Sequence, residues 1–584
     1  MNEQQCDVLK IVKKNNIKNQ RELADITGHS LGSVNKAIKI LQDENYLDEN
    51  MEITKNADVL FEKSKPKNAI ILAAGFGMRM VPINLEIPKG LIEINGEPLI
   101  ERQIKYLHES GINEIYIVVG FMKEQYEYLI DEYNVKLIVC KDYTTKNNLH
   151  SLKCVVDKIG NSYIIPCDIW CAKNPFDSEE LYSWYMVSDE VDDDSTVRVN
   201  RKKELTIVSK GSAGNKMIGI SYIDSESAKP IKDKIIAFSE DKKNDNEFWE
   251  IALYEKGKMQ ILAKVVKMEF AIEINTYEQL RELDENSNQL NTDAIDIITE
   301  ALNVNVEDVV DITVLKKGMT NRSFLFTVKN QRYIMRIPGE GTSELINRRE
   351  EAQVYSVINK RGICDNIVYM NPDNGYKITE FFENARACDC ENEKELELCM
   401  KKLRDFHNQK LKVDHEFKIF EQIEFYESLW NGKPSVYRDY ENTKKNIMSL
   451  ESWINSNVQE KVLTHIDAVP DNFLFVRNID GEEEVRLIDW EYAGMQDPHV
   501  DVAMFCIYSM YDKEKVDRLI DIYFEGKCEK QVRIKIYAYV AACGLLWSNW
   551  CEYKRQLGVD FGEYSLQQYR YAKDFYRLIE NEIR

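Results

Sequence analysis

The sequence of 584 residues contains no apolar run near the roughly 20 residues that a membrane-spanning helix needs. Its first residues, MNEQQCDVLKIVKKNN, also lack the apolar core of a secretion signal and have the apolar spacing of a helix. We therefore expect a protein of the cytoplasm that is not inserted in a membrane. Internal repeats and low-complexity tracts are absent as well, so domain boundaries must be found from other signals.

The sequence also lacks the cysteine spacing of a metal-binding domain. Its thirteen cysteines are scattered without a repeated CxxC frame, and Cys388 and Cys390 are too close together for a zinc finger. We expect buried free thiols instead. The net charge of -22 argues against binding of the whole chain to nucleic acid or to an anionic membrane, so any contact with nucleic acid should be local.

Composition and length indicate a multidomain protein. With 44% hydrophobic and 30% charged residues the composition is that of an ordinary globular protein, and at about 150 residues per domain the length predicts three or four domains. Two polar stretches without apolar periodicity, residues 61–68 and 284–293, mark the expected boundaries. We expect domains at 1–64, 67–286 and 292–584, of mixed α/β and α+β class.

The first segment has three helical patterns, at residues 4–15, 21–27 and 30–45, followed by a short stretch, 46–54, that suggests a hairpin. This arrangement resembles the winged helix-turn-helix of bacterial transcription regulators, with Gly28 in the turn and Ser30 capping the second helix of the motif. Its exposed face would carry side chains able to reach bases and phosphates, namely Ser33, Asn35, Lys36 and Lys39.

Charge does not decide whether this segment binds DNA. Residues 1–65 contain ten basic and eleven acidic side chains, a net charge of about -1, whereas DNA-binding modules are usually basic. The segment could equally serve in dimerisation or docking, and a homodimer stays open.

The middle segment opens with an apolar run, residues 68–72, typical of a buried strand, which continues into AAGFGMRM. Gly75 and Gly77 would let the backbone approach a triphosphate, together with Ala73 and Ala74, and Arg79 adds a cation. The third glycine of GxGxxG and the GK[ST] of a Walker loop are both absent.

Together, LAAGFGMRM, PKGLIEINGEPLI and PCDIW resemble the nucleotidyltransferases that make sugar nucleotides and CDP-alcohols. The resemblance covers residues 67–285 and implies a Rossmann-like mixed sheet, with the nucleotide at the carboxyl ends of its first strands. It implies that Arg79 and Lys89 neutralise the triphosphate and that Asp168 and Glu273 hold Mg²⁺. Asn275 stands where an aspartate is expected, which leaves the number of metals open.

Within this family the segment resembles the bacterial CTP:phosphocholine cytidylyltransferases through KNNLHSL (Asn147, Asn148, Ser151) and the later FWE at residues 248–250, while sugar-phosphate enzymes are the rival. Choline has a cation without hydrogen-bond donors, so its pocket should be aromatic with a carboxylate nearby. The candidates, each of which could instead belong to the core, are Trp170, Tyr185, Tyr222 and Trp249.

The last segment begins with a strand pattern, ITVLKKGMTNRSFLFTVKNQRYIMRIPG, whose Gly318, Thr320 and Asn321 would cover nucleotide phosphates. Arg336 takes the position of the protein-kinase lysine, with Glu350 on the next helix as its expected ion-pair partner. ITEFFEN, which contains Glu380, has the character of a hinge that binds adenine.

THIDAVPDNFLF and VRLIDWEYAG carry the strongest signal in the chain. His465, Asp467 and Asn472 match H-x-D-x-x-x-x-N, where the aspartate deprotonates the acceptor hydroxyl and the asparagine binds Mg²⁺. Asp489, on the next apolar strand, supplies the second metal ligand. The expected fold is the two-lobed fold of protein kinases.

No activation-loop APE follows, which disfavours a polypeptide substrate. Residues 311–584 instead resemble bacterial choline kinases and the related aminoglycoside phosphotransferases, through RIPGEGT, HIDAVPDNFL and IDWEYAGMQDPHVDVA. The resemblance implies an aromatic cage for choline with negative charge beside it. The candidate residues are Trp547, Trp550, Tyr553, Tyr569, Glu491 and Asp497.

The two expected activities fit one another. ATP and choline would give phosphocholine, and CMP transfer from CTP to phosphocholine would give CDP-choline and pyrophosphate. Two alternatives stay open: the same reactions on ethanolamine or another small amino alcohol, and a transcription regulator that uses the enzyme domains as ligand sensors. Oligomeric state and substrate channelling also stay open.

Overall fold

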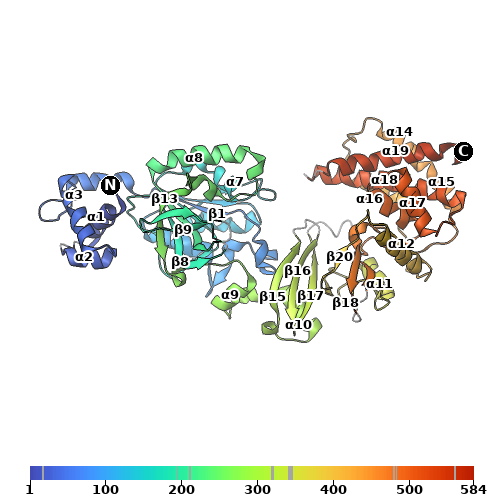
Figure 1. Ribbon diagram of the computed structural model, residues 1–584, viewed down its shortest axis with the longest axis horizontal. Coiled ribbons are helices and arrows are strands. Elements are labelled where there is room, and N and C mark those ends of the chain that lie inside the picture. The colour runs from blue at the N-terminus through green and yellow to red at the C-terminus, as the bar shows by residue number, and fades with distance from the viewer. Residues whose placement is uncertain are drawn as a thin grey trace. The chain divides into compact units, whose positions relative to one another are not determined.

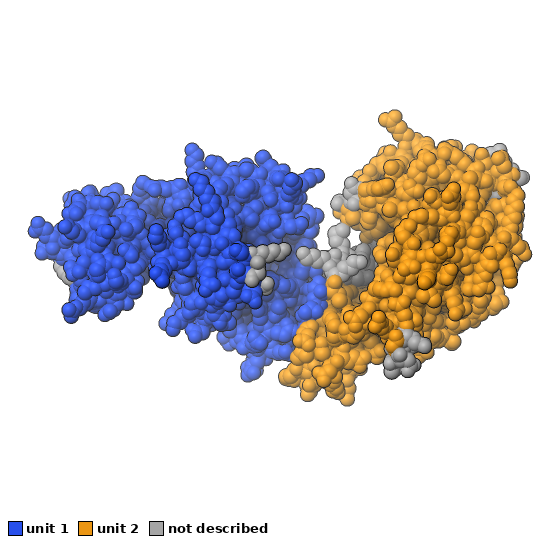
Figure 2. Space-filling model, viewed as in Figure 1, with its two compact units in different colours: residues 1–296, 312–314 blue, residues 297–311, 315–584 orange. Residues whose placement is uncertain are grey.

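The computed structural model describes residues 1–583 except 16, 18, 194, 210–211, 317–320, 340–345, 478–480, 482, 558 and 560. The chain forms two compact units, residues 1–296 with 312–314 and residues 297–311 with 315–584 (Figure 2). The division falls within helix α10 (Asp293–Leu302). Among the described residues no helix is long and apolar enough to cross a membrane.

The first unit begins with a small helical domain made of α1 (Glu3–Asn15), α2 (Gln20–Thr27), α3 (Leu31–Asp43) and α4 (Lys55–Ser64) (Figure 1). Gly28 ends α2 in the left-handed conformation, with φ 68°, and the Ser30 side chain accepts from the Ser33 amide at the start of α3. Both predictions for the turn are confirmed.

The expected hairpin at residues 46–54 is present in its smallest form, with one antiparallel bridge between Leu47 and Ile53. One expectation for this domain was wrong. The polar stretch 61–68 begins inside α4, where Phe61 is buried with Leu9 and Ile38 in the core of the helical domain. Ala57 and Phe61, one helical turn apart, are buried on this helix with Leu60 partly buried beside them, and so short a pattern is easily missed in a charged segment.

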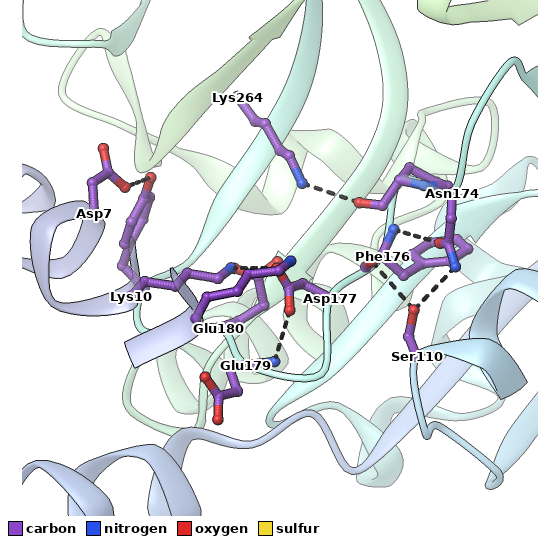
Figure 3. A network of polar contacts seen from close by, with 12 residues as sticks. Asp7, Lys10, Ser110, Asn174, Phe176, Asp177, Glu179, Glu180 and Lys264 are labelled. Carbon is purple, nitrogen blue, oxygen red and sulfur yellow. Dashed lines mark hydrogen bonds and ion pairs between the residues drawn. The ribbon is translucent and has the colours of Figure 1, made fainter. Parts of the chain in front are cut away.

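The helical domain is fixed to the rest of its unit through α1 (Figure 3). Lys10 Nζ lies 3.0 Å from Glu180 and 3.3 Å from Asp177, and Lys13 pairs with Glu179 at 2.5 Å. Glu180 is buried and also accepts from the Tyr163 hydroxyl at 2.9 Å. Lys10 is therefore the counter-charge of a carboxylate that lies inside the neighbouring domain.

A mixed sheet in the order β5–β4–β1–β6–β11–β8–β13–β10–β9, with β12 beside β13, forms the centre of the first unit. Strands β5, β4, β1 and β6 are parallel, whereas β11 is antiparallel to both β6 and β8. The strands are β1 (Asn68–Ala73), β4 (Ile115–Val119), β5 (Lys136–Val139), β6 (Ser162–Pro166), β8 (Trp184–Asp192), β9 (Val197–Val199), β10 (Glu204–Ile207), β11 (Gly214–Ile223), β12 (Tyr254–Glu255) and β13 (Lys258–Val266).

Each face of this sheet is buried by its own apolar cluster, as continuous apolar strands such as residues 69–73 require. Helices α7 and α8 contribute to the cluster on one face and α5 and α6 to that on the other. The remaining elements are β2 (Glu93–Ile94), β3 (Glu97–Pro98), β7 (Ile169–Cys171), β14 (Ala271–Glu273), α5 (Leu99–Glu109), α6 (Tyr128–Tyr133), α7 (Asn148–Lys153), α8 (Ser225–Glu240) and α9 (Tyr277–Leu283).

The second unit has a small lobe and a large helical lobe. In the small lobe β17 lies between β16 and β19, and β18 pairs with β19, all antiparallel. The elements of this part are β15 (Val310–Lys316), β16 (Asn321–Val328), β17 (Gln331–Pro338), β18 (Ile367–Met370), β19 (Lys377–Glu380) and α11 (Arg348–Ile358).

The large lobe buries the longest helix, α18, against α16, α13 and α19 (Figure 1). Its helices are α12 (Glu393–His407), α13 (Ile419–Ser428), α14 (Tyr440–Met448), α15 (Leu450–Asn457), α16 (His499–Tyr508), α17 (Lys513–Tyr523), α18 (Lys530–Gln556) and α19 (Glu563–Ile583). Its strands are β20 (Arg386–Ala387), β21 (Val462–Thr464), β22 (Phe473–Arg477), β23 (Glu483–Leu487) and β24 (Gly494–Gln496).

The expectation of free thiols is confirmed. All thirteen cysteines are free, and most of them are buried. Cys388 and Cys390 belong to the apolar core of the large lobe, and no cysteine takes part in a metal-ligand cluster among the described residues.

Candidate functional sites

A cavity of about 190 Å³ lies where β1 and β6 end at the same edge of the sheet. Gly77 borders it with φ 61°, and a Cβ there would lie 3.3 Å from the Cβ of Lys89, so glycine suits both the conformation and the close approach. The lining residues are Leu72, Ala74, Gly75, Gly77, Lys89, Tyr143, Lys146, Asn147, Asn148, Ser151, Pro166, Cys167 and Asp168. Ala73, the last residue of β1, is buried.

The charged residues expected for CMP transfer converge beside this cavity. Lys89 forms an ion pair with Asp168, and its Nζ also donates to the amide oxygen of Asn275 at 2.8 Å. Arg79 donates to the same oxygen at 2.8 Å. Glu273 belongs to the group, because burial and then the charge of Asp168 raise the pKa of its carboxyl above the ordinary value.

These side chains suit a divalent cation. Asp168 Oδ1 is buried and has no hydrogen-bond partner among the described residues, so it is free to act as a ligand. Carboxylate and amide oxygens are the donors that hard cations prefer. Asn275, however, has its oxygen engaged by two cationic side chains, so the ligand set formed by Asp168 and Glu273 holds two carboxylates.

Three of the proposed aromatic pocket residues, Tyr185, Tyr222 and Trp249, are buried in the core instead. Tyr222 is fully buried and its hydroxyl donates to the Ser64 carbonyl at 2.7 Å, so it is not a substrate-binding residue. Trp249 is also buried, packed beside Tyr185. Trp170 is half-buried, with the Arg102 guanidinium 5.4 Å from its ring. Aromatic side chains usually fill cores, and the sequence contained nothing that distinguishes a core aromatic from one that lines a substrate pocket.

In the second unit, the loop after β21 brings together the residues of the H-x-D-x-x-x-x-N motif. Asn472 Nδ2 donates to the Asp467 carbonyl at 2.9 Å and to its carboxylate at 3.2 Å. Burial, followed by the nearby charge of Asp489, raises the pKa of Asp467 to about 7. Asp489, whose φ is 64°, is the more exposed of the two carboxylates. Asn472 and Asp489 offer oxygen donors that suit a divalent cation.

Asp501 holds the backbone of this loop, a role that the sequence interpretation missed. Its two oxygens accept from the amides of His465 and Ile466 at 3.0 and 2.7 Å, and His407 donates to it at 2.9 Å. His465 in turn donates from Nε2 to the Ile488 carbonyl, next to Asp489. The segment VDVA in the quoted motif contained Asp501, but nothing in its spacing indicated the contact.

The ion-pair partner expected for Arg336 was wrong. Arg336 Nη2 lies 2.5 Å from Glu351, which also pairs with Arg348 at 2.9 Å and is fully buried. Glu350 lies about 100° further round α11, where its amide is capped by the Asn347 side chain. Arg336 remains close to Asp489, because its Nη1 lies 3.8 Å from that carboxylate.

The remaining nucleotide-binding predictions fall partly outside the described residues. Gly318 and Thr320 lie there, as does the side chain of Asn321, whose backbone begins β16. Glu380 ends β19 and accepts from the Asn366 side chain at 2.7 Å.

A continuous series of aromatic rings lies near Asp467. Trp547 lies 5.8 Å from Tyr492 and 5.5 Å from Trp550, measured between ring centroids, and the series continues through Phe561, Tyr564 and Tyr508. The Tyr508 hydroxyl donates to Asp471 at 2.7 Å. Burial raises the pKa values of the Tyr492, Tyr508 and Tyr564 hydroxyls, and Asp467 adds to each shift, so all three lie within its electrostatic reach.

Asp497 and Glu491, the two carboxylates proposed to lie beside these rings, have different surroundings. Asp497 is buried and pairs with Lys535 at 2.6 Å, so its charge is neutralised inside the fold and is not available to a substrate. Glu491 lies 3.5 Å from Arg348, and burial together with Asp489 raises its pKa to about 8. Tyr569 bonds Asp439 and Thr443, away from the series of rings, and Tyr553 is half-buried.

The folds and sites define a nucleotidyltransferase joined to a kinase-like phosphotransferase. Three family models match the chain: "Winged helix-turn-helix DNA-binding" over residues 1–48, "MobA-like NTP transferase domain" over 69–178 and "Choline/ethanolamine kinase" over 312–540.

Through its middle region the chain belongs to the choline-phosphate cytidylyltransferase family. It is 33% identical over 225 residues to the choline-phosphate cytidylyltransferase of Streptococcus pneumoniae, a match that covers 37% of this chain and 96% of the relative. Protein LicA of Haemophilus influenzae is 26% identical over 264 residues, 43% of this chain and 96% of that protein. The crystal structure of the choline kinase LicA from Streptococcus pneumoniae covers 48% of this chain and 98% of its own at 28% identity, with a TM-score of 0.42.

Proposed function

We propose that this chain converts choline to CDP-choline in two steps, with ATP and CTP as co-substrates and Mg²⁺ at both sites. The second unit phosphorylates choline, and the first transfers CMP from CTP to the phosphocholine produced. The observation that carries the proposal is the aromatic series from Tyr492 to Tyr508 beside Asp467, because it joins a candidate general base to rings suited to a quaternary ammonium.

In the kinase step, Asp467 accepts the proton of the choline hydroxyl as this oxygen attacks the γ-phosphorus of ATP, the bond to the bridging oxygen breaks and ADP leaves. Asn472 holds the aspartate through two hydrogen bonds, and Asp501 holds the backbone of the two residues before it. Arg336, paired with Glu351, places a cation on the phosphate side of the cleft. Mg²⁺ bound by Asn472 and Asp489 would neutralise charge on the phosphates.

In the transferase step, Lys89 and Arg79 stabilise the negative charge that develops as the phosphocholine oxygen attacks the α-phosphorus of CTP. Pyrophosphate leaves, and no covalent intermediate with the enzyme is needed. Gly75 and Gly77 bring backbone amides to the triphosphate at the edge of the cavity. Asp168 and Glu273 would hold Mg²⁺, which supplies charge neutralisation at the phosphates.

Mass spectrometry of products, with each nucleotide omitted in turn, tests the proposal. With choline, ATP, CTP and Mg²⁺ we expect CDP-choline and pyrophosphate, with phosphocholine alone when CTP is omitted. Asp467→Asn should block the route from choline and spare the route from phosphocholine. Asp168→Ala should stop both routes at phosphocholine, because CMP transfer is lost. Absence of CDP-choline from the unmodified protein would refute the proposal.

The choice of choline over ethanolamine is tested by comparing kcat/KM for the two alcohols. The aromatic series around Trp547 and Trp550 favours a trimethylated cation, because rings offer no acceptor for the N–H groups of a primary ammonium. A clear preference for ethanolamine would mean that these rings bind a primary ammonium, and it would overturn the choice of choline.

For the winged helix we propose binding to DNA as a second function. Asn35, Lys36 and Lys39 on α3 are exposed, while α1 is the helix engaged with the neighbouring domain. An electrophoretic shift of the protein's own promoter, weakening as salt is raised, tests this proposal. No shift at low salt would leave a docking or dimerisation module, and light scattering would then report whether the chain is a homodimer.

A further inference from the structure

Two cysteine thiols lie in contact beside the nucleotide cavity of the first unit. Cys140 directly follows β5, is buried, and accepts a hydrogen bond from the Ser151 hydroxyl at 3.9 Å. Cys154 caps the carboxyl end of α7, is exposed, and shares a hydrogen bond with the thiol of Cys140. The fold thus brings a buried and an exposed sulfur together at the two ends of one segment.

The segment between the two cysteines supplies a large part of the cavity wall. The lining residues that belong to it are Tyr143, Lys146, Asn147, Asn148 and Ser151. Among the described residues neither cysteine borders the cavity itself. A bond between the two sulfurs would therefore close a ring around the wall of the proposed CTP site without using any side chain of that site.

The contacts around Cys140 favour loss of a proton from the pair. A hydrogen bond from Cys154, against the opposing effect of burial, lowers the pKa of the Cys140 thiol to about 6. Ser151 and the backbone of Asp142 add to this shift. The same contact raises the pKa of Cys154, which holds the shared proton. Transfer of that proton to Cys140 leaves the thiolate, which is the reactive form, on the exposed sulfur.

A second pair of cysteines provides a contrast within the same chain. Cys388 and Cys399 also share a hydrogen bond, but both are buried in the apolar core of the large lobe. Oxidation of cysteine follows thiolate character and exposure. The pair at the nucleotide cavity is therefore the one that a small oxidant in solution reaches.

Formation of a disulfide would move α7. The sulfurs of a disulfide are about 2.05 Å apart, much closer than two thiols in hydrogen-bond contact. Cys140 is fixed to the sheet, because its amide donates to the Val119 carbonyl at the end of β4 at 2.8 Å. The short helix α7 must therefore move toward β5, and Asn148 and Ser151 move with it, away from their positions in the cavity wall.

We propose that Cys140 and Cys154 form a reversible disulfide with hydrogen peroxide as the oxidant, and that this bond weakens the binding of CTP. Peroxide converts the Cys154 thiolate to a sulfenic acid as the O–O bond breaks and water leaves. The Cys140 thiol then attacks this sulfur, the S–O bond breaks and a second water leaves. The two thiols lose two electrons and two protons in total. The effect on CTP rests on the proposed function, whereas formation of the bond does not.

The test treats the reduced full-length protein with hydrogen peroxide and identifies linked peptides by mass spectrometry. We expect a link between residues 140 and 154, none between 388 and 399, and reversal by dithiothreitol. In the linked protein the KM for CTP should rise about fivefold or more, since displacement of positioning groups by about 1 Å is costly. Calorimetry should show the same loss of CTP affinity, and choline phosphorylation by the other unit should not change.

Cys154→Ser is the matched variant, because Cys154 lies outside the cavity wall. It should keep the KM for CTP of the reduced protein and hold that value after peroxide, and Cys140→Ser should resist peroxide as well. Absence of the 140–154 link, a link that leaves CTP binding unchanged, or an equal loss of CTP binding in Cys154→Ser overturns the proposal. If the reduced protein forms no CDP-choline, the proposed function fails, and mass spectrometry with calorimetry still decides on the disulfide.

Discussion

Lys89 Nζ lies 2.8 Å from the amide oxygen of Asn275, at the position where an aspartate is expected in a nucleotidyltransferase. The same oxygen accepts from Arg79, so one neutral side chain orients the two cations that would face the triphosphate. An amide oxygen can accept hydrogen bonds from both cations without neutralising the charge of either one. Asn275 is therefore a positioning residue for the cations, and the carboxylates of Asp168 and Glu273 supply the negative charge at the site.

Replacement of Asn275 by aspartate should strengthen metal binding. The change adds a carboxylate next to Asp168 and Glu273, and an anionic ligand binds a hard cation more strongly than an amide does. We expect the Mg²⁺ concentration for half-maximal CMP transfer to fall about three- to tenfold. Choline phosphorylation by the same protein is the internal control, and an unchanged or higher Mg²⁺ requirement would contradict the assigned roles.

Asp467→Asn should lower the rate of choline phosphorylation by at least about a hundredfold, because an amide cannot accept the hydroxyl proton. The hydrogen bond from Asn472 to the backbone carbonyl is unaffected, and the one to the carboxylate can be kept by the new side-chain oxygen, so the loop should stay folded. The rate is measured with ATP and choline, and CMP transfer to added phosphocholine serves as the control. Retention of more than a tenth of the activity would exclude Asp467 as the general base.

Glu351→Gln and Glu350→Gln form a matched pair that tests the Arg336 contact. Loss of the buried Glu351 charge removes the shorter ion pairs of Arg336 and Arg348, which then keep longer contacts with Glu491, and should cost about 3 kcal/mol of stability. It should also raise the KM for ATP. The neighbouring Glu350→Gln should change neither by much, since Glu350 is not the partner of Arg336. Thermal unfolding and kinase kinetics measure both effects, and equal behaviour of the two variants would contradict the pairing.

Lys10→Ala should destabilise the first unit, although Lys10 belongs to the winged helix. Its removal leaves Glu180 buried with a hydrogen bond from Tyr163 but no cation, at a cost of about 2 kcal/mol. Lys14→Ala is the matched control, because Lys14 is mostly exposed and lies 3.4 Å from Asp177. The melting temperature of the full-length protein is the measurement. If both variants melt alike, the Lys10 contact contributes little.

Residues that the motifs place close together along the chain also lie together in the structure. Asp467 and Asn472 are held together by a short loop, and Gly75 and Gly77 directly follow the apolar strand β1, so local backbone geometry brings each pair into one site. Gly28 and Ser30 likewise cap their helices through contacts within three residues.

Contacts between distant segments were decided by the tertiary structure. The orientation of α11 about its axis points Glu351, and not its neighbour Glu350, toward Arg336, because successive residues of a helix point about 100° apart. Burial in the core removed Tyr222 from the candidate site and paired Asp497 with Lys535. Packing also brought Phe561 beside Trp550 and Tyr564 beside Phe561. The sequence by itself determined which residues are neighbours in the local motifs of both candidate sites. Which aromatic and charged side chains face a substrate depended on how the helices and strands pack.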